Sequence, residues 1–193
     1  MKTAAFLVCA VAVIAGAPPV AHAASGDGAY GRLDGDASFA GHVGAATVAG
    51  RGAFAADVRL RYVEAVGVGV AFVSGAGLSI PFELRPLFPI RFLKAQESGH
   101  GFLDLTLDSV ALELGPTFAL GLARPGMFVG TALEFPLFGQ ARGLFVRLSA
   151  ELRFGPDALA GSGDTPSGVL SLGLGWHEPL RLGLVDARDG RLL

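Results

Sequence analysis

Cysteine is almost absent from this sequence. Its single copy, Cys9, lies in an apolar N-terminal stretch that follows Lys2 and ends shortly before the small-x-small triplet Ala21-His22-Ala23. This order of a positive residue, an apolar core and a cleavage site predicts a secretory signal peptide over residues 1–23. Its removal leaves a chain without cysteine, which excludes disulfide bonds and cysteine-ligated metal sites.

Charge, and lysine in particular, is also scarce. Charged residues make up 17% of the chain, against about 25% in a typical soluble domain. After residue 23, lysine occurs only at position 94. Because the formal net charge is −2, no basic surface is expected for a polyanion, and we expect no nucleic-acid partner.

Long hydrophobic runs are missing beyond the N-terminal segment, although apolar residues make up 51% of the chain and its mean hydropathy is +0.53. A spanning helix needs about 20 consecutive apolar residues, and no later segment supplies them. The mature chain is therefore either soluble outside the cytoplasm or a membrane β-barrel. Its length suggests a single domain.

What the sequence has instead is strict alternation. The segment FAADVRLRY, residues 54–62, places apolar side chains on one face and Asp57, Arg59 and Arg61 on the other, as a two-faced β-strand does. Because no long helices separate such segments, we expect an all-β, antiparallel up-and-down fold. Eight strands are predicted, at residues 33–45, 54–62, 66–72, 78–85, 110–121, 129–137, 144–154 and 170–176.

Two connections between these strands are long. Residues 156–168 are expected to form a flexible polar loop. Residues 86–108 contain PIRFLKAQE, which predicts a short amphipathic helix with Pro89 in its first turn. Two positions for this helix stay open, at a membrane interface or packed on its own domain. The following FLDLTLD also alternates, and we interpret it as a bulge or an extra short strand.

Glycine and charge share one face of the predicted strands. Glycine contributes nothing to packing on a water-facing surface, but inside a narrow barrel it leaves room for large side chains. The same face carries five acids and five arginines, and arginine suits the paired burial of carboxylates. We therefore predict a lumen charge network of Asp57, Arg59, Arg61, Glu83, Arg85, Glu113, Glu134, Arg147, Glu151 and Arg153.

A signal peptide followed by alternating segments resembles the small bacterial outer-membrane β-barrel proteins of the eight-stranded OmpA/OmpX kind. The resemblance implies a transmembrane β-barrel over residues 24–184, a C-terminal tail at 185–193 and a location in the bacterial outer membrane. It also implies a monomer whose partners are outer-membrane lipid and, during biogenesis, the barrel-assembly machinery. Such proteins usually end in an aromatic residue on the last strand, and here either Trp176 or a later residue ends it. Three prolines depart from the pattern, since each removes a ladder hydrogen bond: Pro81, Pro116 and Pro136.

No catalytic or ligand-binding pattern stands out. His42, His100 and His177 lack metal-ligand spacing, and we interpret His177 as an interfacial histidine rather than a partner of a lumen carboxylate. The two carboxylates of Asp34-Gly35-Asp36 fall short of a calcium ligand set, and no serine lies in a nucleophile elbow. We therefore expect no enzymatic activity, no metal and no cofactor.

The leading functional hypothesis is an outer-membrane β-barrel whose lumen is plugged by side chains, because eight strands leave no wide channel. Its role would be structural or adhesive, or the recognition of lipid or a partner by its loops, and not that of an open pore. Two alternatives stay open. One is a secreted or periplasmic soluble β-barrel that binds a lipid-like ligand between inward apolar faces, and the other is a lipid-modifying outer-membrane enzyme.

Overall fold

The computed structural model describes residues 36–94, 96, 98, 100–119, 124–157, 165–180, 182, 185, 186, 191 and 192. The predicted signal peptide, the start of the acidic turn at Asp34 and residues 158–164 of the polar loop lie outside these ranges. Within them the elements are β1 (Ala37–Val48), β2 (Arg51–Tyr62), β3 (Val66–Val73), β4 (Gly77–Ser79), β5 (Phe82–Leu84), α2 (Leu87–Leu93), α3 (Gly101–Asp108), β6 (Ala111–Phe118), β7 (Gly126–Pro136), β8 (Gly143–Phe154), β9 (Ser167–Leu180), β10 (Val185–Asp186) and β11 (Arg191–Leu192).

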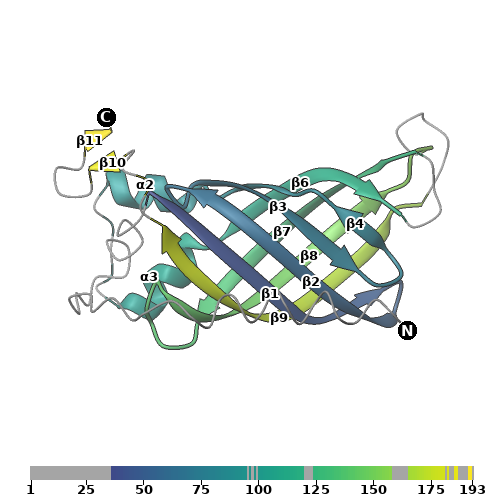
Figure 1. Ribbon diagram of the computed structural model, residues 1–193, viewed down its shortest axis with the longest axis horizontal. Coiled ribbons are helices and arrows are strands. Elements are labelled where there is room, and N and C mark those ends of the chain that lie inside the picture. Colours follow the sequence, from purple (N-terminus) through teal and green to yellow (C-terminus); the bar gives the residue numbers. More distant parts are fainter. Residues whose placement is uncertain are drawn as a thin grey trace.

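The strands β1 to β9 form one closed antiparallel sheet. Strands that are neighbours in the sequence pair with each other, except β4 and β5, and β9 returns to pair with β1 along its whole length, from Ala37 opposite Leu180 to Val48 opposite Val169. Since β4 and β5 share the position between β3 and β6, the barrel has eight strand positions. The predicted eight-stranded up-and-down barrel is confirmed, and Figure 1 shows its strongly tilted strands.

The predicted strand 78–85 is interrupted, and proline explains the break. Pro116 of β6 lies opposite Ile80, whose N–H donates to the Pro116 carbonyl at 3.1 Å. Because proline has no N–H, the return hydrogen bond cannot form, and Pro81 follows directly. The strand therefore divides into β4 and β5 on either side of this point, while Pro136 is tolerated as the last residue of β7.

Several strand ends differ from the prediction. The weakest candidate, 33–45, becomes the full-length strand β1, which begins at Ala37 and runs to Val48. At the other end of the chain, β9 continues past Trp176 to Leu180, so a later residue ends the last barrel strand. The predicted strand 110–121 stops at Phe118.

The 86–108 connection forms two helices. The predicted short helix is confirmed as α2, with Pro89 in its first turn. The interpretation of FLDLTLD as a bulge or strand is wrong, because these residues form α3, whose buried Asp104, Leu105 and Asp108 share one helical face. The Ser109 hydroxyl joins the end of α3 to β7, donating to the Glu134 carbonyl at 2.8 Å and accepting from the Glu134 N–H at 2.9 Å. Neither helix, nor any other in the described ranges, has the length and hydropathy to cross a bilayer.

The ends of the barrel differ. The end of β9, the start of β1 and the two helices lie at one end, which we call the helical end (Figure 1). The opposite end carries the short β1–β2 and β3–β4 turns, and there β6 and β8 end and β7 and β9 begin. At that opposite end a small apolar cluster of Ala46, Val73 and Val169 is buried inside the barrel.

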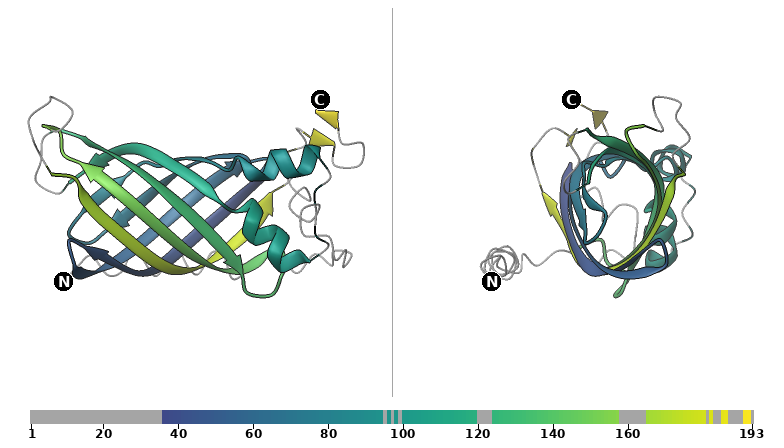
Figure 2. Two further views of the ribbon diagram at one scale, coloured as in Figure 1. Left: turned by 180° about the vertical axis from the view of Figure 1, so that it is seen from behind. Right: turned by 90° about the vertical axis from the view of Figure 1, so that its right-hand side faces the viewer.

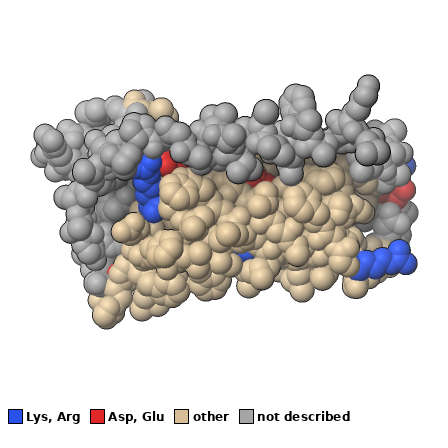
Figure 3. All heavy atoms as spheres, turned by 60° about the horizontal axis from the view of Figure 1, so that its bottom comes forward, with Lys and Arg blue, Asp and Glu red and all other residues tan. Residues whose placement is uncertain are grey.

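The polarity of the wall is the reverse of that in a soluble barrel. Leu60, Leu148 and Leu172 are 50%, 45% and 56% exposed, whereas Arg59 and Arg147 are each 2% exposed. Figure 3 shows one face of the molecule, where uncharged residues cover nearly all of the described middle part and most charged side chains lie toward the ends. The apolar faces of the strands therefore point outward around the barrel, and the charged faces point inward.

Candidate functional site

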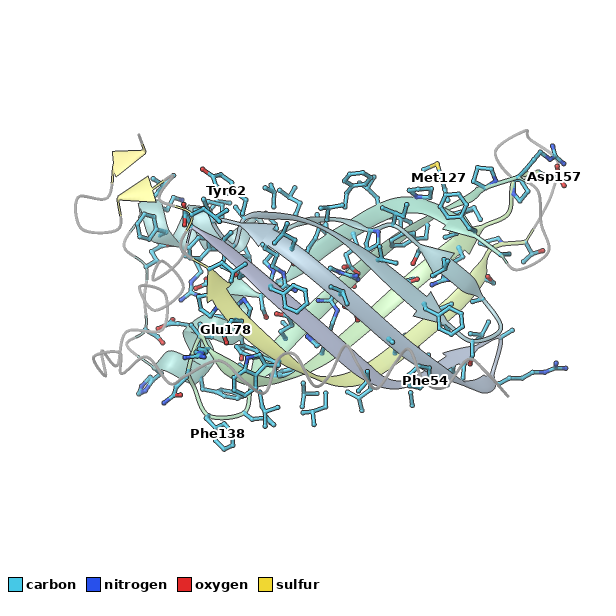
Figure 4. All side chains as sticks on the ribbon, viewed as in Figure 1. Phe54, Tyr62, Met127, Phe138, Asp157 and Glu178 are labelled. Carbon is cyan, nitrogen blue, oxygen red and sulfur yellow. The ribbon has the colours of Figure 1, made fainter. Side chains whose placement is uncertain are left out.

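The candidate site is the charged interior of the barrel. Strands β2, β6, β7 and β8, together with β5 and the residue after it, place all ten predicted side chains on the inner face. Nine of them are buried, with the least exposed being Arg85 at 0%. The exception is Asp57, whose side chain is 17% exposed. In contrast, the labelled Phe54, Tyr62 and Met127 in Figure 4 lie on the outside of the barrel.

Glu134 of β7 is the hub of the network. Its carboxylate accepts hydrogen bonds from three guanidinium groups, those of Arg61, Arg85 at 2.8 Å and Arg147 at 2.7 Å. Glu83 of β5 lies beside it and accepts from Arg61 at 2.8 Å and also from Arg85. These groups come from β2, β5, β7 and β8, so the hub ties distant parts of the wall together across the lumen.

Toward the middle of the barrel the network continues through Glu113 of β6. Its Oε1 accepts from Arg147 Nη2 at 2.6 Å and from Arg59 Nη2 at 3.1 Å. Arg59 Nη1 also lies 3.5 Å from Asp57 Oδ1. Each guanidinium in this region faces at least two carboxylates, as buried charge requires.

Glu151 and Arg153 of β8 form a separate pair nearer the opposite end. Arg153 Nε donates to Glu151 Oε2 at 2.9 Å, and its Nη1 donates to the Ala76 carbonyl at 3.1 Å. The structure thus places eight of the ten predicted residues in one network and these two in an outlying pair.

Glycine creates the space that these side chains occupy. A Cβ at Gly69 would lie 2.6 Å from Cδ of Arg59, and one at Gly67 would lie 3.0 Å from Cγ of Arg61. Both distances are shorter than ordinary van der Waals contact. The glycines of β3 therefore allow the two arginines of β2 to lie against the neighbouring strand.

Four interior residues were not predicted as part of the network. Glu64 lies in the β2–β3 turn and is 2% exposed. Its carboxylate accepts hydrogen bonds from the Ser38 hydroxyl and from Arg85 at 3.0 Å, and it lies 3.0 Å from His177 Nε2. The interpretation of His177 as an interfacial histidine is therefore wrong, since it is buried beside Glu64 and packs edge-on against Phe145.

Burial alone would raise the pKa of Glu64, but the hydrogen bond with His177 and the positive charge of Arg85 hold that pKa well below its ordinary value. The fourth residue is His42, whose Nδ1 lies 3.2 Å from Asp57 Oδ1. His42 and Ser38 are both even-numbered positions of the predicted strand 33–45, so alternation along a strand was an available signal for His42. Glu64 gave no such signal, because alternation does not extend into a turn.

The three histidines do not form a common site. His42 lies in β1 beside Asp57, and His177 lies in β9 beside Glu64. His100 is exposed just before α3. Among the residues that the structure describes, no three His, Cys, Asp or Glu side chains are arranged to hold a metal ion.

No family model and no curated protein matches this chain. A solved structure that it resembles is the N-terminal β-barrel domain of Pseudomonas aeruginosa OprF. The two share 7% sequence identity with a TM-score of 0.43, and the match covers 75% of this chain and 98% of the OprF domain.

Proposed function

We propose that this chain is an integral outer-membrane β-barrel protein with a closed lumen, which acts through its outer surface and loops and does not conduct solutes. The inverted polarity of the wall carries the proposal. Exposed leucines and valines surround the barrel, while its arginines and carboxylates lie inside. In water this arrangement would expose apolar surface without compensation, whereas in a bilayer it is the stable one.

The contents of the lumen support its closure. The layer of Glu64, His177 and Phe145 lies at the helical end, the Arg–Glu network fills the middle, and the apolar cluster lies at the opposite end. An eight-stranded barrel is only wide enough for its side chains to fill it. A plugged barrel offers its partners only its loops and its lipid-facing wall, which favours a structural, adhesive or recognition role.

The alternatives lack a supporting observation. A soluble barrel that binds a lipid-like ligand needs an apolar interior, and the interior here is charged. A lipid-modifying enzyme needs a nucleophile beside a base, and the two buried histidines, His42 and His177, lie beside carboxylates instead.

Two measurements test the proposal. After expression in a Gram-negative host, the protein should stay in the outer-membrane fraction through salt and carbonate washes and leave it only with detergent. Recovery in the soluble periplasmic fraction without detergent would falsify membrane residence. In planar bilayers the purified protein should give no steady conductance, and a stable ohmic pore in the wild-type protein would refute the closed lumen.

A further inference from the structure

The helices α2 and α3 show the same inverted polarity as the barrel wall. Arg91 of α2 lies between them and donates to the carboxylate of Asp104 and, at 2.8 Å, to Asp108 Oδ1. Both aspartates of α3 are buried, at 0% and 1% exposure. The helix pair therefore hides its ionic groups between its two members, which a soluble helical hairpin would turn toward water.

Burial alone would raise the pKa of Asp104, but hydrogen bonds from the Ser98 N–H and from Arg91 lower it below the ordinary value for an aspartate. Asp104 is therefore an anion at neutral pH and pairs with Arg91. The ionic contact between the helices is thus part of their packing and is not free to bind a partner.

Phe88 and Leu105 are buried, but most of the other large apolar side chains of this unit are exposed. We define the apolar foot as six side chains from α2, α3 and the loop after β7, which are 37–82% exposed: Ile90, Leu93, Phe102, Leu103, Leu107 and Phe138. The loop lies against the start of α3, since a Cβ at Gly139 would be 3.6 Å from the Phe102 nitrogen. Leu93 at 82% and Phe138 at 72% are the most exposed.

The foot continues the apolar wall. The strand residues that lead into α2 and out of α3, Leu84 and Leu112, are 48% and 49% exposed on the outer face. Figure 2 shows both helices at the rim of the barrel on one side, where its wall ends, and not across the mouth. Apolar side chains that are exposed both on the strands and on the adjoining rim helices would lie in the same medium.

The charge at the edge of the foot fits a lipid headgroup layer. Lys94 follows α2 directly and is exposed, and it is the single lysine after residue 23. A lysine next to an apolar face can extend its ammonium group to lipid phosphates while its stem stays among apolar groups. The two acids of α3 are buried against Arg91, whose charge offsets one of theirs, so neither aspartate presents its carboxylate directly to an anionic surface.

We propose that the apolar foot docks into the phospholipid leaflet on the side of the helical end, with its apolar side chains in the headgroup–acyl boundary and Lys94 at the phosphates. This inference rests on the proposed function, and it adds a specific lipid-binding surface outside the strands. The helix pair acts as an interfacial anchor that fixes the depth of the barrel on that side.

The chain offers a clean fluorescence test, because the described residues contain no cysteine. Single cysteines are introduced by Leu93→Cys and Phe102→Cys at the foot, Leu172→Cys on the wall and Gln96→Cys as the polar control beside α2. Each is labelled with an environment-sensitive fluorophore after reconstitution into phosphatidylethanolamine–phosphatidylglycerol vesicles. Quenching is measured with phospholipids spin-labelled either near the headgroup, for the foot probes, or in the middle of the acyl chain, for the wall probe, and separately with aqueous iodide.

We expect spin-labelled lipid to quench the two foot probes several-fold more than the Gln96→Cys probe, and iodide to give the reverse order. Quenching of the foot probes by iodide alone, with the wall probe still quenched by lipid, would overturn the inference and leave the proposed function intact. Protection of the foot probes from both quenchers would also overturn it, by showing that protein covers the foot. A wall probe that lipid does not quench would overturn the proposed function itself.

Discussion

The hub carboxylate gives the sharpest test of the buried network. Glu134→Gln keeps the shape of the side chain and removes its charge, so three arginines lose their shared counter-ion. Hydrogen bonds to charged groups contribute about 1.5–3 kcal/mol each, but these three cannot simply be added. Arg61 keeps Glu83, Arg85 keeps Glu64, and Arg147 keeps Glu113.

The expected cost is therefore that of leaving one buried charge uncompensated, about 3–5 kcal/mol in the free energy of unfolding. The matched control is Arg124→Gln, which breaks the Arg124–Asp157 pair at 2.8 Å, whose side chains are 69% and 48% exposed. Such a surface pair contributes at most about 1 kcal/mol. The two variants remove one charge each and differ mainly in burial.

Urea titration in lipid vesicles, followed by the fluorescence of Trp176, the single tryptophan, measures both variants. A double variant that adds Arg147→Gln to Glu134→Gln should cost less than the sum of the two single changes, by about 0.5–3 kcal/mol. If Glu134→Gln and Arg124→Gln both shift stability by less than about 1 kcal/mol, the lumen charges are solvated and the reasoning fails.

Three further predictions follow from the wall, the glycines and the helices. Leu172→Arg should lower stability in vesicles by about 2–4 kcal/mol, and an unchanged urea midpoint would contradict a lipid-facing wall. Gly69→Ala should cost about 1–3 kcal/mol, because its Cβ would lie 2.2 Å from a backbone oxygen, whereas Gly52→Ala, with nothing within 4 Å, should be neutral in the same titration. The pKa of Asp104 is lowered on folding, so its stabilising contribution is present above the unfolded pKa and is lost as the pH falls below about 4. The measurement is hydrogen exchange of the α3 amides, expressed as protection factors corrected for intrinsic exchange. In the wild type these protection factors should decrease as the pH falls below about 4, whereas in Asp104→Asn they should already be low at neutral pH and should not change with pH.

Sequence alternation carries most of the information about the wall. Side chains alternate strictly between the two faces of a strand. Arg59 and Arg61 flank Leu60 in the sequence, so the two arginines must lie on one face and Leu60 on the other, and this can be assigned without coordinates. The same rule locates Glu113, Glu134 and Arg147 on the inner face. Alternation does not show which arginine contacts which carboxylate, because these contacts depend on strand register and on strand tilt across the lumen. The role of Glu134 as the hub therefore appears only in the three-dimensional structure.

The sequence-based prediction fails at one turn and at one of the two short helices, for a physical reason. Glu64 lies in a turn, with a backbone φ of 50°, and no periodic rule assigns its side chain to a face. The segment FLDLTLD alternates by two, yet Asp104 and Asp108 also stand four residues apart, which places them on one helical face. A segment this short is compatible with both periods, and its contacts with Arg91 and β7 decide between them.

The secondary structure of FLDLTLD decides which groups its two aspartates contact. As a strand, FLDLTLD would place its aspartates on the polar face of the barrel, as one more part of the lumen network. As α3, it directs Asp104 and Asp108 toward Arg91 and leaves Phe102, Leu103 and Leu107 exposed. The barrel and the helix pair thus reach the same inverted polarity through different secondary structures. Two different local geometries thus expose apolar side chains over adjoining surfaces, and the leaflet that we propose, extending from the wall to the foot, would account for both.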